Sequence, residues 1–430
     1  MDLTPLLAFA ALLFLNVPVT VAIGAGALLF FLEQQGLPLT IFPQRLMSSS
    51  ESFPLLAIPM FTLAGVIMNY SGITRRLLNL AETLVGHWTG ALAQMNVLLA
   101  TLMGFESGSG NADAAMQSKM LGREMVRRGY APAFAAAVVA ASAVITPLIP
   151  PGLGFVLYGY LANVSVGRLF LAGVVPGLML MVALMITTRF MARNRGYKPV
   201  RQHMASAGEI FAAVRDAAWA LTVPVVVIVG LREGIFTPTE AGAVIAVYSL
   251  LVGLLVHREL KFRHMWGIIT EAASATALVM MIISAADALS LYLTLEQIAS
   301  RLATSLASAT QSPLLMLLLI NLFLLAVGMV LESVAALVLL TPILAPIGAA
   351  LGIDPVHLGL LVVLNLTLGA VHPPTGTLMF ITCAVLEVRV ADYTRAMLPL
   401  LGAELLVLLL LIFVPPLSLF LPNLAFGPGR

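Results

Sequence analysis

The chain has 430 residues, of which 60% are hydrophobic and only 10% are charged, and its mean hydropathy is +1.03. Soluble domains carry roughly 25% charged residues, so this composition excludes an ordinary water-soluble fold. The net charge of +2 is too small to indicate a nucleic-acid partner, and the single cysteine, Cys383, excludes an internal disulfide. We therefore expect most of the chain to be surrounded by membrane lipid.

Apolar runs recur along the chain, from 6–32 near its start to 398–414 near its end. Crossing the hydrocarbon core takes about 20 helical residues, and about ten such runs fit. None shows the two-residue alternation of a barrel strand, so the sequence predicts an all-α polytopic membrane protein. The run 6–32 lacks a preceding basic segment and a cleavage site, and we predict that it forms a retained first helix.

A Gly/Ser-rich segment, FESGSG at 105–110, separates two helical stretches at 89–104 and 111–128. Each stretch is too short for a comfortable span, so we predict a re-entrant helical hairpin whose tip exposes backbone groups at membrane depth. A second hairpin is predicted over 312–352, with its tip at 328–333. Such a tip could instead be only a close contact between helices.

Each hairpin is followed by a helix that is predicted to break at a double proline, in TPLIPPG (146–152) and VHPPTG (371–376). Adjacent prolines remove donors and clash with the preceding turn, which frees upstream carbonyls for a cation such as Na⁺. The amides that open the next half-helix favour a carboxylate. A double proline can also be only a packing kink, but the repetition of the pattern favours a functional break.

The two halves of the chain are related by a shift of 223 residues, which places four of the five prolines between Trp88 and Pro176 on other prolines. The pairs are Pro132 and Pro355, Pro150 and Pro373, Pro151 and Pro374, and Pro176 and Pro399. The turn before Gly129 carries four basic residues, whereas the equivalent turn before Gly352 carries none. Because cytoplasmic turns collect Lys and Arg, we predict two inverted-topology repeats, which are typical of secondary transporters.

Acidic residues in or near apolar segments are costly and usually functional. They are Glu106, Asp113, Asp287, Glu332 and Glu404. Three of them lie at the hairpin tips, whereas Asp287 and Glu404 could be structural. The sequence Thr-Pro-Thr-Glu at 237–240 predicts only a capped helix start.

Short motifs in order over nearly the whole chain resemble those of one family. They are 107–109 with 112–115, 128–130, 149–151, 234–241, 340–344, 352–357, and 373–374 before Gly376. The family is the large membrane subunit (DctM-like) of tripartite ATP-independent periplasmic (TRAP) transporters. Together the motifs are specific, although each alone is weak.

The resemblance implies an elevator-type transporter in the bacterial inner membrane, in which a transport domain slides against a scaffold and Na⁺ is the coupling ion. It also implies two partners, a small four-helix membrane subunit (DctQ-like) and a soluble periplasmic substrate-binding protein (DctP-like). The implied substrate is a small organic anion. Two or more Na⁺ sites are expected, each between a hairpin tip and the break of the same half.

The family pattern assigns candidate residues by position. For the first Na⁺ site they are Ser107, Gly108, Ser109, Asn111, Thr146 and Pro150. For the second they are Gly328, Glu332, Ser333, His372, Pro373 and Gly376. For the substrate they are Ser109, Asn111, Asp113, Pro151, Gly152, Thr375 and Gly376.

The same resemblance divides the chain into scaffold and transport segments. Segment 1–87 forms scaffold helices and the arm of the first repeat, and 88–188 forms the first transport half, with its hairpin at 88–128 and broken helix at 132–163. Segment 189–232 is a basic cytoplasmic linker and linking span. Segment 233–310 forms scaffold helices and the second arm, 311–414 forms the second transport half, with its hairpin at 311–351 and broken helix at 356–386, and 415–430 is a C-terminal tail.

The chain departs from the family pattern at His372, where Thr is usual, at Glu332, where Asp is usual, and at Glu106 and Gly110. His372 could bind a substrate carboxylate, contribute a proton, or simply be a packed neutral imidazole. Three alternatives to the main hypothesis are a stand-alone carrier or ion antiporter of the same architecture, a polytopic membrane enzyme, and a structural subunit. Against the enzyme, the sequence shows no HExxH pair, Ser/His/Asp order or phosphate loop.

Overall fold

The computed structural model describes residues 4–15, 17–34, 36–106, 108–309 and 312–427. Within these residues all regular structure is helical, and seven helices are long and apolar enough to cross a membrane. An eighth span is formed if the bent pair 132–148 and 153–162 is counted as one. The other apolar helices are shorter than 18 residues. The predicted all-α membrane fold is confirmed, with fewer full spans than the composition suggested.

The helices before the central connection are the following: α1 Thr4–Phe14, α2 Val19–Glu33, α3 Ile41–Ser48, α4 Ala57–Tyr70, α5 Ile73–Val85, α6 Ala91–Met103, α7 Gly110–Gln117, α8 Arg123–Arg127, α9 Pro132–Ala143, α10 Leu153–Ala162 and α11 Val166–Asn194. The connecting helix is α12, Ala207–Arg232. The helices after it are α13 Pro238–Leu251, α14 Met265–Leu295, α15 Ile298–Ala309, α16 Pro313–Gly328, α17 Ser333–Ala350, α18 Pro355–Gly369, α19 Thr377–Leu386, α20 Val390–Phe413 and α21 Pro416–Phe426.

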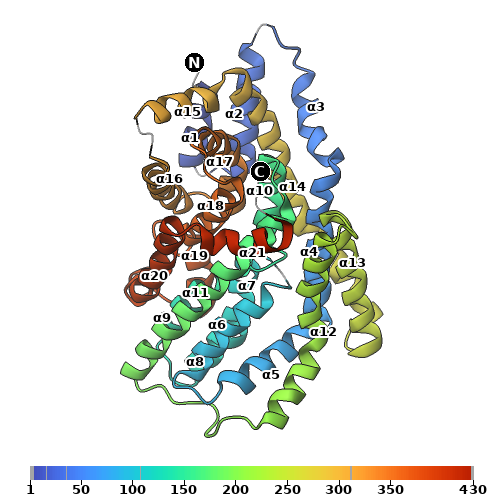
Figure 1. Cartoon of the computed structure of the whole chain (residues 1–430), viewed down its shortest axis with the longest axis vertical. Coiled ribbons are helices and arrows are strands. Elements are labelled where there is room, and N and C mark those ends of the chain that lie inside the picture. The colour runs from blue at the N-terminus through green and yellow to red at the C-terminus, as the bar shows by residue number, and fades with distance from the viewer. Residues whose placement is uncertain (1–3, 16, 35, 107, 310–311, 428–430) are drawn as a thin grey trace.

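The order of helices recurs in the two halves. Helices α7 and α17 begin at Gly110 and Ser333, and α9 and α18 begin at Pro132 and Pro355, a spacing of 223 residues in both cases. Corresponding helices lie toward opposite ends of the long axis, with α5 and α6 low and α15 and α16 high in the view of Figure 1. The broken helices α9–α10 and α18–α19 lie between them.

The prediction of one helix over 6–32 is wrong. Two helices, α1 and α2, occupy this run and pack against each other. Pro18 lies between them as the residue before α2, with ψ at 134°, outside the helical range. A proline here favours a helix boundary, because it has no amide hydrogen and disfavours a helical conformation at the residue before it. The contact is close at Gly26, where a Cβ atom would lie 2.7 Å from the Pro5 carbonyl oxygen.

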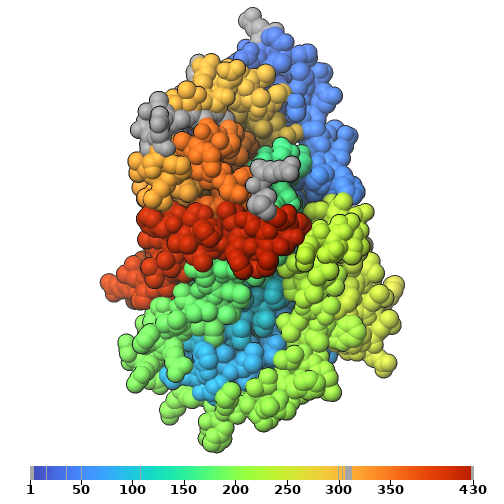
Figure 2. Space-filling view, viewed as in Figure 1, coloured from blue at the N-terminus to red at the C-terminus, as the bar shows by residue number. Residues whose placement is uncertain are grey.

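Two groups of helices form the body of the protein. In one, α4 packs along α13, α2 packs against α14, and α12 packs along α5. In the other, α9 and α11 pack against α20, and α16 packs against α18. In Figure 2, α20 and α21 form a band across the surface between the two ends of the molecule. Helix α13 begins as predicted, because the Thr237 hydroxyl and the Glu240 carboxylate cap each other's backbone amides.

The broken helices lie at the centre of the second group. Every residue of α18 from Val356 to Gly369 is buried, as is nearly all of α9. A helix that is apolar on every side is surrounded by other helices or lipid, and here the covering is protein. The first break is buried throughout, whereas the second is exposed at Pro374 and Thr375. The buried backbone groups of both breaks depend on protein partners for hydrogen bonds.

The packing of α11 on the first break gives a testable prediction. A Cβ at Gly173 would lie 2.1 Å from the Leu148 carbonyl oxygen and 2.6 Å from the Phe155 ring. We expect Gly173→Ala to lower the melting temperature of the detergent-purified protein, because overpacking costs about 1–3 kcal/mol. Gly402→Ala is the control, since a Cβ there meets no atom within 4 Å. Equal melting temperatures for the two variants would contradict the prediction.

Candidate functional site

The first hairpin tip lies directly against the first break. Gly108 has a left-handed backbone, with φ at 57°, and a Cβ there would lie 2.5 Å from the Pro151 carbonyl oxygen. Gly152 opens α10 and approaches the Pro147 carbonyl in the same way. Only glycine fits these approaches, so the small residues of the tip and of the break let their backbones meet.

A buried carboxylate joins the hairpin to the break. The Thr146 hydroxyl donates to Asp113 Oδ2 at 2.8 Å, and the same hydroxyl oxygen lies 3.4 Å from the Ala100 carbonyl oxygen. Thr146 is fully buried and Asp113 is 1% exposed. Three kinds of oxygen therefore converge here from α6, α7 and the break, a donor set that suits a hard cation.

The second tip contacts the second break through its backbone. The Thr375 hydroxyl and amide both donate to the Met329 carbonyl, the amide at 3.2 Å. The Ser333 hydroxyl donates to the Leu366 carbonyl of α18 at 3.2 Å. Gly328 lies so close to α18 that a Cβ on Gly369 would be 2.4 Å from its Cα. The Pro150-Pro151 and Pro373-Pro374 bonds are both cis.

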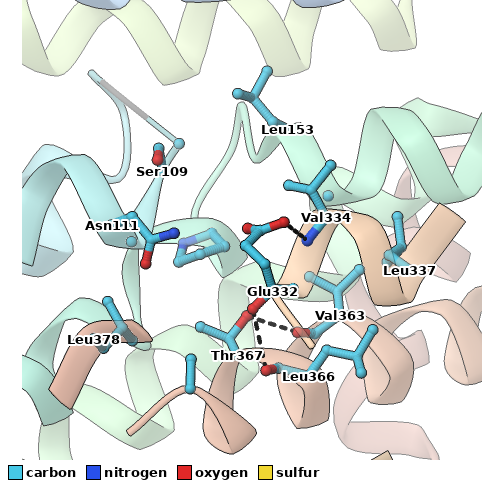
Figure 3. A pocket seen from close by; sticks show the side chains of 16 residues that line it. Ser109, Asn111, Leu153, Glu332, Val334, Leu337, Val363, Leu366, Thr367 and Leu378 are labelled. Carbon is cyan, nitrogen blue, oxygen red and sulfur yellow. Dashed lines mark hydrogen bonds between the residues drawn. The ribbon is translucent and has the colours of Figure 1, made fainter. Parts of the chain in front are cut away.

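Residues of both tips line one cavity of about 80 Å³. This volume has room for several water molecules. Figure 3 shows Ser109 and Asn111 of the first tip facing Glu332 of the second. The first turns of four helices, α7, α10, α17 and α19, contribute to its lining. A helix N-terminus carries roughly half a unit of positive charge, so this arrangement favours a bound anion.

Among the residues that the structure describes, Glu332 is the only charged side chain that lines this cavity. Its carboxylate caps α17 by accepting from the Val334 amide at 2.9 Å and the Ala335 amide at 3.1 Å. No Lys or Arg side chain is among the lining residues within the described ranges. An anion in this cavity would therefore depend on backbone amides, helix dipoles and any bound cation.

The predicted site residues are distributed unevenly around this cavity. Those that line it are Gly108, Ser109, Asn111, Glu332 and Ser333. Asp113 and Thr146 form the buried pair described above. Pro150 lines a separate apolar pocket against α11 and α12. Ser107 lies outside the described residues.

The remaining candidates lie in the two breaks and at the second tip. They are Pro151, Gly152, Gly328, His372, Pro373, Thr375 and Gly376. His372 is 9% exposed, and its Nδ1 lies 3.0 Å from the Gly369 carbonyl oxygen. The Gly376 amide donates to the His372 carbonyl at 3.2 Å. Within the described ranges, no three His, Cys, Asp or Glu residues cluster as metal ligands.

Sequence reasoning missed Thr377. Its hydroxyl donates to Asn111 Oδ1 at 3.2 Å, which links the tip of the first half to a half-helix of the second. A hydroxyl residue directly after the Pro-Pro-Thr-Gly motif was the available signal. Its partner could not be found from local sequence, because 266 residues separate the two.

The cap on α17 gives a second prediction. We expect Glu332→Ala to speed hydrogen exchange of the amides at 334 and 335, because loss of a cap costs about 1 kcal/mol. Glu332→Asp, which keeps a capping carboxylate, is expected to exchange at nearly the wild-type rate. Exchange mass spectrometry on the detergent-purified protein measures both. Unchanged exchange in Glu332→Ala would mean that the carboxylate does not hold the start of α17.

Residues 6–417 match the family described as the DctM component of the tripartite ATP-independent periplasmic transporter. The sialic acid TRAP transporter large permease protein SiaM of Vibrio cholerae is 38% identical over 419 residues, which cover 97% of this chain and 98% of that protein. The isethionate TRAP transporter permease protein DctMQ of Oleidesulfovibrio alaskensis is 39% identical over 413 residues. The match covers 96% of this chain and 65% of that longer relative.

The fold is also similar to that of a solved transporter. The crystal structure of YdaH from Alcanivorax borkumensis superposes with a TM-score of 0.62 at 17% identity, covering 96% of this chain and 99% of YdaH. At this identity the likeness concerns the fold alone. It agrees with the all-helical membrane architecture described above.

Proposed function

Because the chain belongs to the family of the DctM component of tripartite ATP-independent periplasmic transporters, we propose that it couples uptake of a small organic anion to the entry of Na⁺. The chain is a large permease subunit, a multi-pass protein of the bacterial inner membrane and a transporter, not an enzyme. The relatives are named for sialic acid and isethionate. Both compounds carry an acidic group, which supports an organic anion as the substrate.

The cavity between the two tips is the observation that carries this proposal. Four helix N-termini contribute to its lining, and no basic side chain in the described part of the chain does. An anion placed there also meets the negative charge of Glu332. Na⁺ held by nearby carbonyl and hydroxyl oxygens would offset that repulsion, so anion binding would depend on prior cation binding.

We assign one candidate cation site to each hairpin tip, and both tips contribute residues to this cavity. The first would use the oxygens around Asp113 and Thr146, where a carboxylate, a hydroxyl and the Ala100 carbonyl converge. The second would use the backbone of the second tip and break, including the carbonyls of Met329 and Leu366. Na⁺ would order the tips and complete the site.

We further propose that the two transport halves, 88–188 and 311–414, cross the membrane as one body against the scaffold segments 1–87 and 233–310. The Asn111–Thr377 bond and the tip-to-break contacts support movement of the hairpins together. The scaffold would be enlarged by a small membrane subunit, and a periplasmic binding protein would deliver the substrate. Exposed apolar side chains on α12 and α14, such as Phe211 and Trp266, offer a surface for that subunit or for lipid.

Uptake into proteoliposomes tests the coupling. The binding protein and the small subunit are supplied with the permease, and an inward Na⁺ gradient is expected to drive accumulation of the ligand of that binding protein. A proton gradient of equal size, without Na⁺, should give little accumulation. Equal uptake under both gradients would refute Na⁺ coupling. Uptake without the binding protein would favour a stand-alone carrier.

The buried threonine of the first break gives a residue-level prediction. We expect Thr146→Val to raise the half-saturating Na⁺ concentration roughly 5- to 10-fold, because it removes a hydroxyl from an oxygen cluster. Thr146→Ser keeps the hydroxyl and should behave as wild type. Thr188→Val is the matched control, since Thr188 is fully buried in α11 and its hydroxyl has no partner within the described part of the chain. A similar Na⁺ dependence in Thr146→Val and Thr188→Val would exclude the first cation site.

A further inference from the structure

A cleft of about 440 Å³ lies away from the transport cavity, where the turn between α8 and α9 meets the connection from α11 to α12. Its lining includes three cationic side chains, Arg128, Arg195 and Lys198, and two aromatic ones, Tyr130 and Tyr197. Nothing in the proposed transport cycle uses these residues. The connection lies at the low end of the molecule in Figure 1, close to α5 and α8.

Charge balance in the cleft leaves two cations without a carboxylate. Arg128 is paired with Glu124, with Nε 2.8 Å from Oε1. Among the described residues, no ion pair forms with Arg195 or Lys198, and Arg195 instead lies over the Phe134 ring at 5.0 Å. Both side chains belong to exposed residues. Two positive charges are therefore available to an anion.

The wall of the cleft is built before any ligand arrives. The rings of Tyr130 and Tyr197 stack with centroids 4.0 Å apart, and the Ala131 amide donates to the Tyr197 hydroxyl at 2.9 Å. The amides of Val200 and Arg201 both donate to the Gly86 carbonyl, at 3.0 and 2.9 Å. These bonds hold the connection against α9 and against the end of α5, so the cations project from a positioned loop.

The residue types around this cleft are typical of a membrane–water boundary. Arg189 lies over the Trp88 ring at 5.5 Å, and Trp88 precedes Leu92 of the cleft lining by four residues. Trp and Tyr are enriched at headgroup level, and Lys and Arg gather on the cytoplasmic side. Basic pockets between membrane helices on that side suit the phosphate of anionic lipids.

We propose that this cleft binds the phosphate group of an anionic phospholipid, with Arg195 and Lys198 contacting the phosphate and the tyrosine stack lying beside the glycerol region. The bound lipid would tie the end of the first transport half to the connection that leads into α12. A free phosphate ion offers the same charged group but no glycerol or acyl chains. A purely local role for the cations, as complements to the C-termini of α8 and α11, would show no preference for lipid.

The test compares two double variants of the full-length chain purified in a neutral detergent. Arg195→Gln with Lys198→Gln removes the two free cations of the cleft. Arg258→Gln with Lys261→Gln removes the same charge from the basic connection between α13 and α14, outside the cleft. Native mass spectrometry measures binding of phosphatidylglycerol, phosphatidylcholine and inorganic phosphate. Circular dichroism verifies that both variants are folded.

We expect wild type to retain phosphatidylglycerol in preference to phosphatidylcholine. The cleft variant should lose roughly 10- to 30-fold in phosphatidylglycerol affinity, since each basic side chain near an anionic lipid contributes about 1 kcal/mol. The control variant should bind as wild type does. Equal losses in both variants, or no preference for phosphatidylglycerol in wild type, would overturn the proposal. Inorganic phosphate that displaces the lipid at equal concentration would overturn the assignment to a lipid.

Discussion

The constraint on which the structure depends is that backbone groups freed by a broken helix cannot remain unpaired in a membrane interior. The second break shows how they are paired. The Ala370 carbonyl accepts from the amides of Leu378 and Met379, and the Val371 carbonyl accepts from the Tyr393 hydroxyl at 2.7 Å. These bonds come from α19 and α20, whereas the His372 carbonyl is paired within the break itself, by the Gly376 amide. The breaks are therefore stable only within the packed bundle, which is why α9 and α18 are buried on all sides.

The same broken helices gather several helix N-termini, each with a partial positive charge, around one cavity. Interrupting a membrane helix creates a new N-terminus at depth, and a hairpin tip creates another. The two halves together bring four of these N-termini to one cavity. These N-termini can bind an anion without lysine or arginine, whose charged side chains would be costly to bury. The two carboxylates are likewise held by short-range partners. Glu332 accepts hydrogen bonds from the amides that begin α17, and Asp113 accepts one from the Thr146 hydroxyl.

Small residues make this geometry possible. Gly108, Gly152 and Gly369 each allow a backbone approach that a Cβ would block. The long helices that pack around the breaks meet the same requirement, as Gly173 of α11 does against Leu148. The site and its packing are thus one structure, in which stability and binding depend on the same close contacts between backbones.

The sequence by itself determined the features that follow from local chemistry. Hydrophobic content identified the membrane fold, glycines and serines located the hairpin tips, and paired prolines located both breaks, because these residues act on the backbone where they stand. The prediction of a single helix over 6–32 was wrong, because it rested on the long apolar run and neglected the helix-breaking effect of Pro18. Tertiary structure alone decided which tip faces which break, the Asn111–Thr377 bond, and the meeting of Arg195 and Lys198 with Tyr130. These contacts join residues far apart in the chain, and they follow from the packing of whole helices, which no local pattern encodes.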